Sequence, residues 1–291
     1  MIGGDDYLDP KIADFFIGHP GSLRPVHAMV EPYDIDDDME PILTKALGGG
    51  VRARIPRARA SRKWKVDIPS VYPQDVAGLR HLLAATVGPY VWVDPWSRVT
   101  NMLTPEESTL ASLVSPSQLA QGGGGWRLVG LEGYQTAAAT RSNPTQGSVT
   151  VGTAPVPPAT VGVPVTASAW IASSRTGGGR VSLQWLSGSG SVMSTVTGNF
   201  VSGMDGLRRS TATGVAPWGA TSARVYVQYA DVLSMPAITW TDGATPWDVG
   251  NGTRKVLVGG VSRSIRQASQ ASRLHDFSFT ITEVGPPGVI S

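Results

Sequence analysis

The stretch Gly88-Pro-Tyr-Val-Trp-Val-Asp-Pro-Trp-Ser-Arg-Val-Thr-Asn101 divides the chain into two kinds of sequence. Before it, charged residues are well spread and the pattern is that of strand, helix and strand. After it comes a long tract rich in Gly, Ser, Thr, Ala and Val, and from about Arg254 the earlier character returns. This order predicts a framework domain in two pieces, residues 1–100 and 253–291, with a second domain, residues 101–252, inserted between them.

The composition indicates a protein that is mainly β with many turns. Charged residues make up 16% of the 291 residues, against the usual ~25%, whereas Gly (35) and Pro (22) are frequent. The absence of Cys excludes disulfides and thiolate metal sites, and a net charge of +2 gives no strong overall field for nucleic acid. With no membrane-length apolar run and an acidic N-terminus broken by Gly, we expect synthesis in a cytoplasm and no membrane insertion.

The outer parts of the chain predict a small framework with one helix. The segment Lys63–Pro69 alternates apolar and polar residues, as a half-buried strand does. A helix is expected to begin at Pro73 and to end before Gly88, followed by a strand over Tyr90–Pro95 that the proline ends. Near the C-terminus, Asp276–Glu283 predicts a strand whose apolar side carries Phe277, Phe279 and Ile281. We expect a split β-barrel or sandwich with one helix, an α+β framework.

The tract from Trp126 to Gly250 predicts short strands separated by Gly, Ser and Pro turns. Its clearest strands are Val163–Ile171, Arg180–Leu186, Ser191–Thr197, Gly206–Gly214 and Ala220–Tyr229. Apolar residues occupy alternate positions in these strands, which is typical of a β-sandwich with one core face and one polar face on each sheet. Upstream, Thr104-Pro-Glu-Glu107 has the residues of a capping box and predicts a short helix to about Val114.

Two blocks of opposite charge lie in the first part of the chain. One is acidic and the other is basic; they comprise Asp36, Asp37 and Asp38, and Arg52, Arg54, Arg57 and Arg59. The basic block is open to interpretation as a nucleic-acid patch or as the outward side of strands that face solvent or a neighbouring subunit. No aromatic residues alternate with the arginines to stack on bases, so we expect a subunit interface or a solvated face, and no nucleic acid.

The sequence contains no recognisable motif for catalysis or cofactor binding. The sequence has no phosphate-binding loop, no dinucleotide fingerprint and no nucleophile elbow, and its 4 His residues show no ligand-type spacing. Glycoside hydrolysis requires two carboxylates that face one bond. Between residues 133 and 250 the acids are only Asp205, Asp231, Asp242 and Asp248, two of them beside Gly as in turns. We expect no enzyme activity, no metal and no cofactor.

Residues 164–250 resemble the carbohydrate-binding jelly rolls that accompany many glycosidases. The resemblance is carried by Val165-Thr-Ala-Ser-Ala-Trp-Ile171, Arg180-Val-Ser-Leu-Gln-Trp-Leu186, Ala216-Pro-Trp-Gly-Ala-Thr-Ser-Ala-Arg-Val-Tyr-Val227 and Ala244-Thr-Pro-Trp-Asp-Val-Gly250. The polar sides of these strands supply a candidate glycan face of aromatic and planar polar groups: Trp170, Gln184, Arg224, Tyr226 and Gln228. The sequence departs from the pattern in having few acidic or Asn residues on that face. Alternatively, Trp170 and Tyr226 cover the second sheet or contact another subunit.

Residues 50–101 and 254–283 resemble minor tail proteins of siphophages of actinobacteria, including distal-tail-like proteins. The resemblance is carried by the strand Trp64–Ile68, the helix after Pro73, the stretch Tyr90–Asn101 and the strand Phe277-Ser-Phe-Thr-Ile-Thr-Glu283. It implies a ring, often hexameric, around the tail axis, from which an added β-sandwich projects. It also implies a structural virion protein of the tail tip or baseplate, with copies of itself, tail-tube proteins and tail-tip proteins as partners. Host cell-wall glycan is a further candidate partner, which the jelly-roll resemblance implies. The alternative is a carbohydrate-binding adsorption module or an accessory module of a glycosidase.

Overall fold

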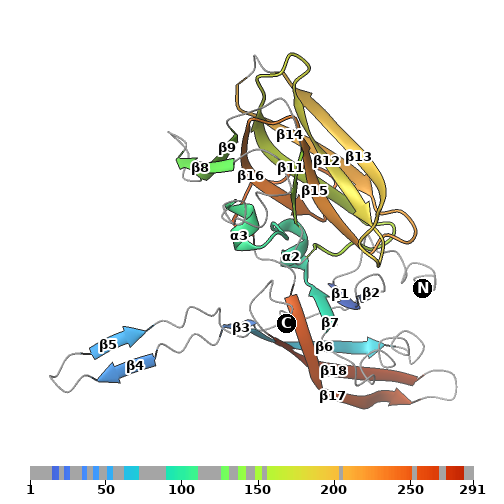
Figure 1. Ribbon diagram of the computed structural model, residues 1–291. Coiled ribbons are helices and arrows are strands. Elements are labelled where there is room, and N and C mark those ends of the chain that lie inside the picture. The colour runs from blue at the N-terminus through green and yellow to red at the C-terminus, as the bar shows by residue number, and fades with distance from the viewer. Residues whose placement is uncertain are drawn as a thin grey trace. The chain divides into compact units, whose positions relative to one another are not determined.

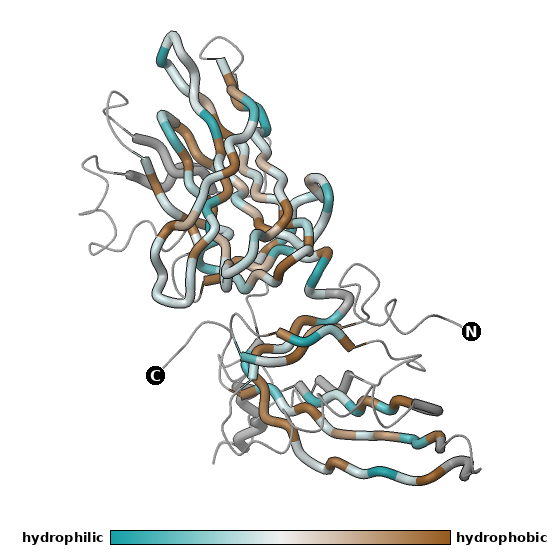
Figure 2. Tube along the Cα trace, turned by 90° about the vertical axis from the view of Figure 1, so that its right-hand side faces the viewer, coloured by the Kyte–Doolittle hydropathy of each residue, from teal (hydrophilic) through white to brown (hydrophobic). Residues whose placement is uncertain are grey.

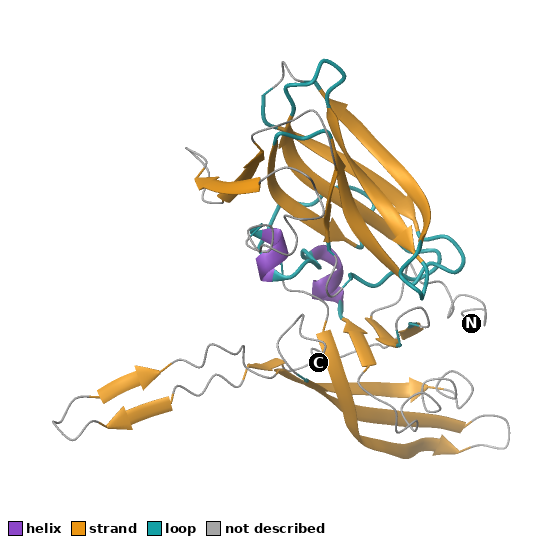
Figure 3. Cartoon of the chain, viewed as in Figure 1, coloured by secondary structure: helices purple, strands orange, loops and turns teal. Residues whose placement is uncertain are grey.

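The computed structural model is mainly β, as the composition predicted (Figure 1, Figure 3). Most of the described residues are in strands and few are in helices, and their sheets do not close into a barrel. The described residues are 15–19, 23–26, 35–37, 42–45, 51–54, 62–71, 90–110, 126–130, 137–141, 148–152, 156–202, 206–250, 254–268 and 273–284.

By compactness the chain divides into two units. The larger unit comprises Met1–Pro25, Val91–Thr253 and Pro287–Ser291, and the smaller unit comprises Val26–Tyr90 and Arg254–Pro286. Each unit is therefore made of segments that are distant in the sequence. The domain boundaries expected above, at residues 100/101 and 252/253, remain a prediction.

The larger unit contains two antiparallel sheets. In the four-strand sheet the order is β10 (Ser148–Val151), β15 (Ser222–Gln228), β12 (Gly179–Leu186) and β13 (Val192–Val201). In the five-strand sheet the order is β14 (Arg208–Val215), β11 (Pro164–Ala172), β16 (Val232–Thr239), β9 (Ala137–Arg141) and β8 (Trp126–Gly130). The five strands expected most clearly from the sequence are β11 to β15, so those predictions are confirmed.

The inner faces of the two sheets form one apolar core, so the unit is a β-sandwich. The alternation read from the sequence is confirmed, and Figure 2 shows it as hydrophobic positions recurring along the strands. The fully buried inward side chains are Val165, Ala167, Ala169 and Ile171 on β11, Val181, Leu183 and Trp185 on β12, and Ala223, Val225 and Val227 on β15. Because burial of this apolar surface is the main favourable term in folding, these positions hold the two sheets together.

One edge of the sandwich is closed by a direct approach of β13 to β14. A Cβ atom added at Gly198 of β13 would lie 2.2 Å from the carbonyl oxygen of Thr211 and 2.6 Å from that of Val181. Beside it, the Asn199 side-chain oxygen accepts a hydrogen bond from the Thr211 backbone N–H at 2.7 Å. Glycine is therefore required at residue 198 by space rather than by backbone angle.

The segment from Tyr90 to Asn101, which leads into the sandwich, contains a short helix that was not predicted. β7 spans Tyr90–Val93, and α2 spans Pro95–Val99. Pro95 does follow the strand as predicted, but it also begins α2, because the Asp94 carboxylate accepts the Ser97 backbone N–H at 2.5 Å and so caps the helix. β1 (Phe15–Gly18) pairs with β7, and its Phe16 ring packs edge-on against Trp240 at 5.0 Å. Phe16 therefore belongs to the sandwich core.

Asn101 fastens the entering segment to the five-strand sheet. Its Nδ2 donates to the carbonyl oxygens of Pro236 (2.9 Å) and Asp248 (3.2 Å). Its Oδ1 accepts from the backbone N–H groups of Leu103 (3.2 Å) and Ile238 (3.1 Å). The side chain is buried, and these four bonds use the full capacity of an amide.

α3 (Pro105–Ser108) follows and confirms the predicted capping box. The Thr104 hydroxyl accepts from the Glu107 backbone N–H at 3.1 Å, and the Glu107 carboxylate reaches back to the Thr104 backbone. The second carboxylate oxygen of Glu107 accepts from the Gly152 backbone N–H at 3.1 Å, so this buried acid is a structural link. The prediction that this helix reaches about Val114 is wrong, because α3 ends at Ser108 and Thr109 and Leu110 form a turn in which Leu110 has a φ of 64°.

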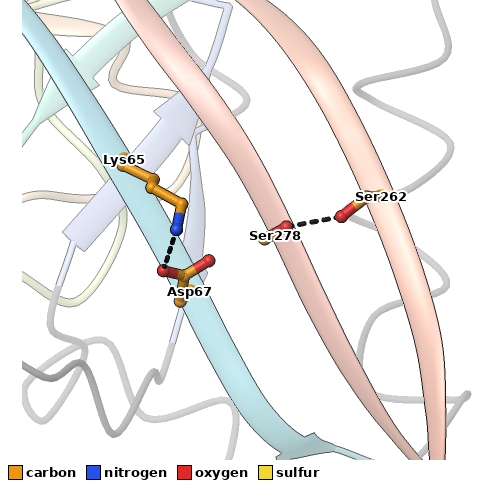
Figure 4. Close-up of polar contacts among 4 residues, drawn as sticks. All are labelled: Lys65, Asp67, Ser262 and Ser278. Atoms are coloured by element: carbon orange, nitrogen blue, oxygen red, sulfur yellow. Dashed lines mark hydrogen bonds and ion pairs between the residues drawn. The ribbon is translucent and has the colours of Figure 1, made fainter.

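The smaller unit is an antiparallel sheet in the order β17 (Arg254–Ala268), β18 (Arg273–Glu283), β6 (Arg62–Val71) and β3 (Ile35–Asp37). Its predicted alternation is confirmed, with buried side chains at Trp64, Val66, Ile68, Phe277, Phe279 and Ile281. Its polar positions carry the exposed pair Lys65–Asp67 at 3.1 Å and a hydroxyl bond between Ser262 and Ser278 at 2.6 Å (Figure 4). β4 (Ile42–Lys45) and β5 (Val51–Arg54) form a separate hairpin. The helix expected from Pro73 lies outside the described residues.

Candidate functional site

The outward side of the four-strand sheet brings together four of the five residues of the candidate glycan face. Because Val181, Leu183 and Trp185 point into the core, their neighbours on β12 point outward, and the same holds for β15. The register pairs Arg180 with Gln228, Ser182 with Tyr226, and Gln184 with Arg224. We call the surface formed by Arg180, Gln184, Arg224, Tyr226, Gln228 and Phe200 the Arg–Gln face.

Two matching hydrogen bonds cross the β12–β15 ladder on this face. Arg224 donates its Nε–H to Oε1 of Gln184 at 2.9 Å, and Arg180 donates its Nε–H to Oε1 of Gln228, also at 2.9 Å. Each strand supplies one arginine and one glutamine, and the Ser182–Tyr226 pair lies between them. The two guanidinium groups are therefore held in place before any ligand arrives, which lowers the entropy cost of binding.

An aromatic side chain supports one of the two arginines. The Arg180 guanidinium lies over the Phe200 ring, 4.8 Å from its centroid, and Phe200 is the register partner of Arg180 on β13. The Phe200 side chain is 59% exposed, which is unusual for a phenylalanine. Arg180 is thus fixed at its edge by Gln228 and at its planar side by Phe200, so its free edge is directed away from both.

The face carries positive charge without compensating acids. Its outward strand positions near the two Arg–Gln pairs are Ser148, Thr150, Arg180, Ser182, Gln184, Thr195, Thr197, Phe200, Arg224, Tyr226 and Gln228. None of these is acidic, and neither arginine makes an ion pair with any residue that the structure describes. Surface arginines usually have acidic neighbours available, so this pattern makes the face attractive to anions.

Ser182 lies between the two Arg–Gln pairs on β12. Ser182 is fully buried, and its Oγ has no hydrogen-bond partner among the described residues. Gln184 is also buried, whereas Arg180, Arg224, Tyr226 and Gln228 are half-buried. A ligand on this surface would therefore contact the guanidinium, amide and aromatic groups and not the serine.

Trp170 is not part of this surface. It lies on β11 in the five-strand sheet, with Arg209 and Ser234 as its register partners. Segment 241–250 contacts the same outward side: Arg209 Nη2 donates to Ser168 Oγ at 3.1 Å and to the Thr245 carbonyl. Burial lowers the pKa of Arg209. The expected convergence of all five candidate residues therefore does not occur, because alternation along a strand fixes the face but not the sheet.

The aspartates of the sandwich that the structure describes have local roles or are exposed. The Asp231 carboxylate accepts from the Ser174 backbone N–H and so holds the turn after β11. The Asp248 side chain accepts from the Val249 backbone N–H at 2.7 Å, and Asp242 is exposed. Asp205 lies outside the described residues. Among the residues described, no group of three or more His, Cys, Asp or Glu is placed to hold a metal ion. The expectation that the chain is not an enzyme remains a prediction.

Among the described residues, the acidic block lies opposite basic residues of β6 and not opposite the basic block. In the β3–β6 register, Asp36 is opposite Lys63 and Asp37 is opposite Arg62. Arg52 and Arg54 lie on β5, opposite Thr44 and Ile42 of β4. Asp38, Arg57 and Arg59 lie outside the described residues. The role of these residues in a subunit interface remains a prediction.

Two residues of the Arg–Gln face were not among the sequence candidates. Arg180 occupies an alternate position with Ser182 and Gln184, so the same alternation already placed it on the polar side. Phe200 lies beyond the predicted end of its strand at Thr197, because β13 continues to Val201 through Gly198. No signal in the sequence pairs Phe200 with Arg180, since a bulge shifts the β12–β13 register between this pair and the pair Ser182–Thr197.

No protein-family model and no curated protein matches the sequence. Among solved structures, the chain is similar to the enzymatically active domain of tailspike protein 4 of bacteriophage CBA120, with 12% identity and a TM-score of 0.31. The match covers 51% of this chain and 22% of that one. A similarity at this level assigns neither fold nor function. No helix in the described part of the chain is long and apolar enough to cross a membrane.

Proposed function

We propose that the chain is a non-catalytic structural protein of a bacteriophage tail, and that its β-sandwich binds glycan on the host surface through the Arg–Gln face. The observation that carries the binding proposal is the pair of outward guanidinium groups, each fixed by a glutamine, beside Tyr226 and the exposed Phe200. The tail proposal rests on the sequence resemblance of residues 50–101 and 254–283 to siphophage minor tail proteins.

The chemistry of the face suits a hydroxyl-rich polymer. Tyr226 and Phe200 offer apolar rings for the flat faces of sugars, and the planar polar groups around them offer hydrogen bonds to ring substituents. The face is the outward side of a β-sheet and carries long side chains. Such a surface suits one side of an extended chain, with modest affinity at each site.

Assembly of several copies on a phage tail would compensate for the modest affinity of one such site. We propose that copies assemble into a ring, often hexameric in the proteins it resembles, that joins the tail tube to tip proteins. Several sandwiches on one ring would bind a polymeric wall together, and the combined affinity would exceed that of one site by orders of magnitude. The opposed charge blocks motivate contacts between copies, with Arg52 and Arg54 as candidate contributors.

A pull-down with host cell walls tests the binding proposal. The full chain should sediment with purified walls, and the double variant Arg180→Ala/Arg224→Ala should remain largely in the supernatant. The matched control is Lys65→Ala/Arg263→Ala, which removes the same charge from exposed positions of the smaller unit. We expect the control to sediment like the wild type. No release of soluble sugar is expected in the same tubes, and wall degradation would contradict the non-catalytic assignment.

Electron microscopy and particle-mass measurements test the tail proposal separately. The purified protein at high concentration, or a tail preparation labelled with antibody against it, should show rings at the tail tip. A protein that stays monomeric at high concentration and is absent from virions would overturn the tail assignment and leave the binding proposal to be judged on its own.

A further inference from the structure

We propose that the ligand of the Arg–Gln face is a polyanionic glycan, one that carries carboxylate or phosphate groups along its chain. This inference rests on the proposed function of the face as a glycan-binding surface. It follows from which atoms of the two Arg–Gln pairs remain available to a ligand.

The two hydrogen bonds leave each Arg–Gln pair with more unused donors than unused acceptors. An arginine Nε–H can only donate, so each glutamine must turn its Oε1 toward the arginine. What remains of each pair is the two Nη groups of the arginine and the Nε2 group of the glutamine, and none of these atoms has a hydrogen-bond partner among the described residues. Each glutamine oxygen uses one of its two acceptor sites for its arginine, so donors outnumber acceptors at each pair. A surface of donors is complementary to a ligand group that only accepts, as carboxylates and phosphates do.

The positive charge of the face also favours an anionic ligand. Arg180 and Arg224 are both cationic side chains, and the outward strand positions around them carry no acid. A neutral sugar hydroxyl could accept from these donors, but it would not compensate the charge. An anionic group does both, and two Nη groups can hold a carboxylate or phosphate in a bidentate arrangement. The face therefore favours an anionic over a neutral glycan of the same shape.

The spacing of the two arginines favours a polymer over a small acid. Gln184, the register partner of Arg224, lies four positions from Arg180 along β12, which corresponds to ~13 Å at the rise of a β-strand. A single monosaccharide acid would contact one pair only. A chain with repeated acidic groups would contact both pairs and pass over Tyr226, which lies between them.

Binding of four defined polymers to the full chain tests the inference. The probes are a polyuronate, a poly(glycerol phosphate), neutral dextran and single-stranded DNA, each immobilised for surface-based binding measurements. We expect both anionic glycan-type polymers to bind and dextran not to bind. Between about 50 mM and 200 mM salt, affinity should fall by about tenfold, as expected for roughly two charge contacts. The variant Arg180→Gln/Arg224→Gln should lose this binding, while Lys65→Ala/Arg263→Ala should keep it.

The outcomes separate the inference from the proposed function. Equal binding of dextran and the anionic polymers, without salt dependence, would overturn the polyanion inference and leave glycan binding intact. Failure of every polymer and of host cell walls to bind would overturn the proposed function itself. DNA binding as tight as that of the glycan polymers would overturn the glycan assignment in favour of general polyanion binding. The salt dependence of the wild type decides the matter even if the arginine variants do not fold.

Discussion

Arg224 on β15 and Gln184 on β12 share a hydrogen bond of 2.9 Å from Nε to Oε1, and the same bond recurs between Arg180 and Gln228 with the strands exchanged. The glutamines thus act as positioning residues for two cations. Substitution of each glutamine by glutamate adds one negative charge at nearly constant shape. The substitution therefore tests the contribution of charge to ligand binding.

The double variant Gln184→Glu/Gln228→Glu is expected to lose polyanion binding without unfolding. Each new carboxylate would pair with its arginine and cancel the charge of the face. We expect at least about tenfold weaker binding to an anionic polymer, the equivalent of ~1.4 kcal/mol, together with a loss of salt dependence. Titration at several salt concentrations measures both. Unchanged affinity and salt dependence would show that charge on this face does not select the ligand.

Asn101 is expected to stabilise the sandwich through its four hydrogen bonds. Asn101→Ala would leave buried backbone groups of Ile238 and Pro236 without their partner. We expect a loss of about 2–4 kcal/mol in the free energy of unfolding, measured by urea denaturation. Thr195→Ala, at an exposed position of β13, is the control and should change stability by less than about 0.5 kcal/mol. Equal effects of the two substitutions would refute the role given to Asn101.

Gly198 is expected to tolerate no side chain. Gly198→Ala would place a methyl group against the carbonyl oxygens of Thr211 and Val181 and force β13 away from β14. We expect a destabilisation of about 1–3 kcal/mol or more. Gly177→Ala is the matched control, because a Cβ there meets nothing within 4 Å. Thermal unfolding of both variants compares them, and a Gly198→Ala variant as stable as Gly177→Ala would contradict the described edge.

Phe16 and Phe200 provide a second matched pair. Phe16 is fully buried against Trp240, so Phe16→Ala should cost about 3–5 kcal/mol. Phe200 is mostly exposed, so Phe200→Ala should change stability by less than about 1 kcal/mol and act on binding instead. Urea denaturation of the two variants checks this order. The reverse order would mean that residues 15–18 do not belong to the sandwich core.

Much of the fold could be predicted from the sequence, because the alternation of apolar and polar residues along a strand indicates which side of the strand is buried. The inward residues of β11, β12 and β15, the apolar side of β18 and the capping box at Thr104 were all predicted from local pattern. The pairing of strands was not, since it depends on contacts between residues far apart in the chain. Phe16, which packs on Trp240, illustrates this: its own surroundings in the sequence carry no sign of that partner.

The candidate site was likewise predicted in part, because the sequence pattern indicates the side of a strand but not the strands that pair with it. Polar alternation correctly placed Gln184, Arg224, Tyr226 and Gln228 on outward positions, and register then brought them together. Trp170 satisfied the same alternation but lies on the other sheet. A single strand pattern cannot distinguish the two outer faces of a sandwich, because both are polar by the same period of two. Substitutions on the two outer faces can show which of them binds the ligand.

The most direct measurement of the central claim compares two aromatic substitutions on opposite sheets. The dissociation constant for host cell-wall glycan is to be measured for the wild type, Tyr226→Ala and Trp170→Ala, after checking that all three unfold at similar temperatures. The account predicts that Tyr226→Ala weakens binding by about tenfold, as for the loss of ~1.5 kcal/mol of aromatic contact, and that Trp170→Ala binds like the wild type. Normal binding by Tyr226→Ala together with loss of binding by Trp170→Ala would contradict it.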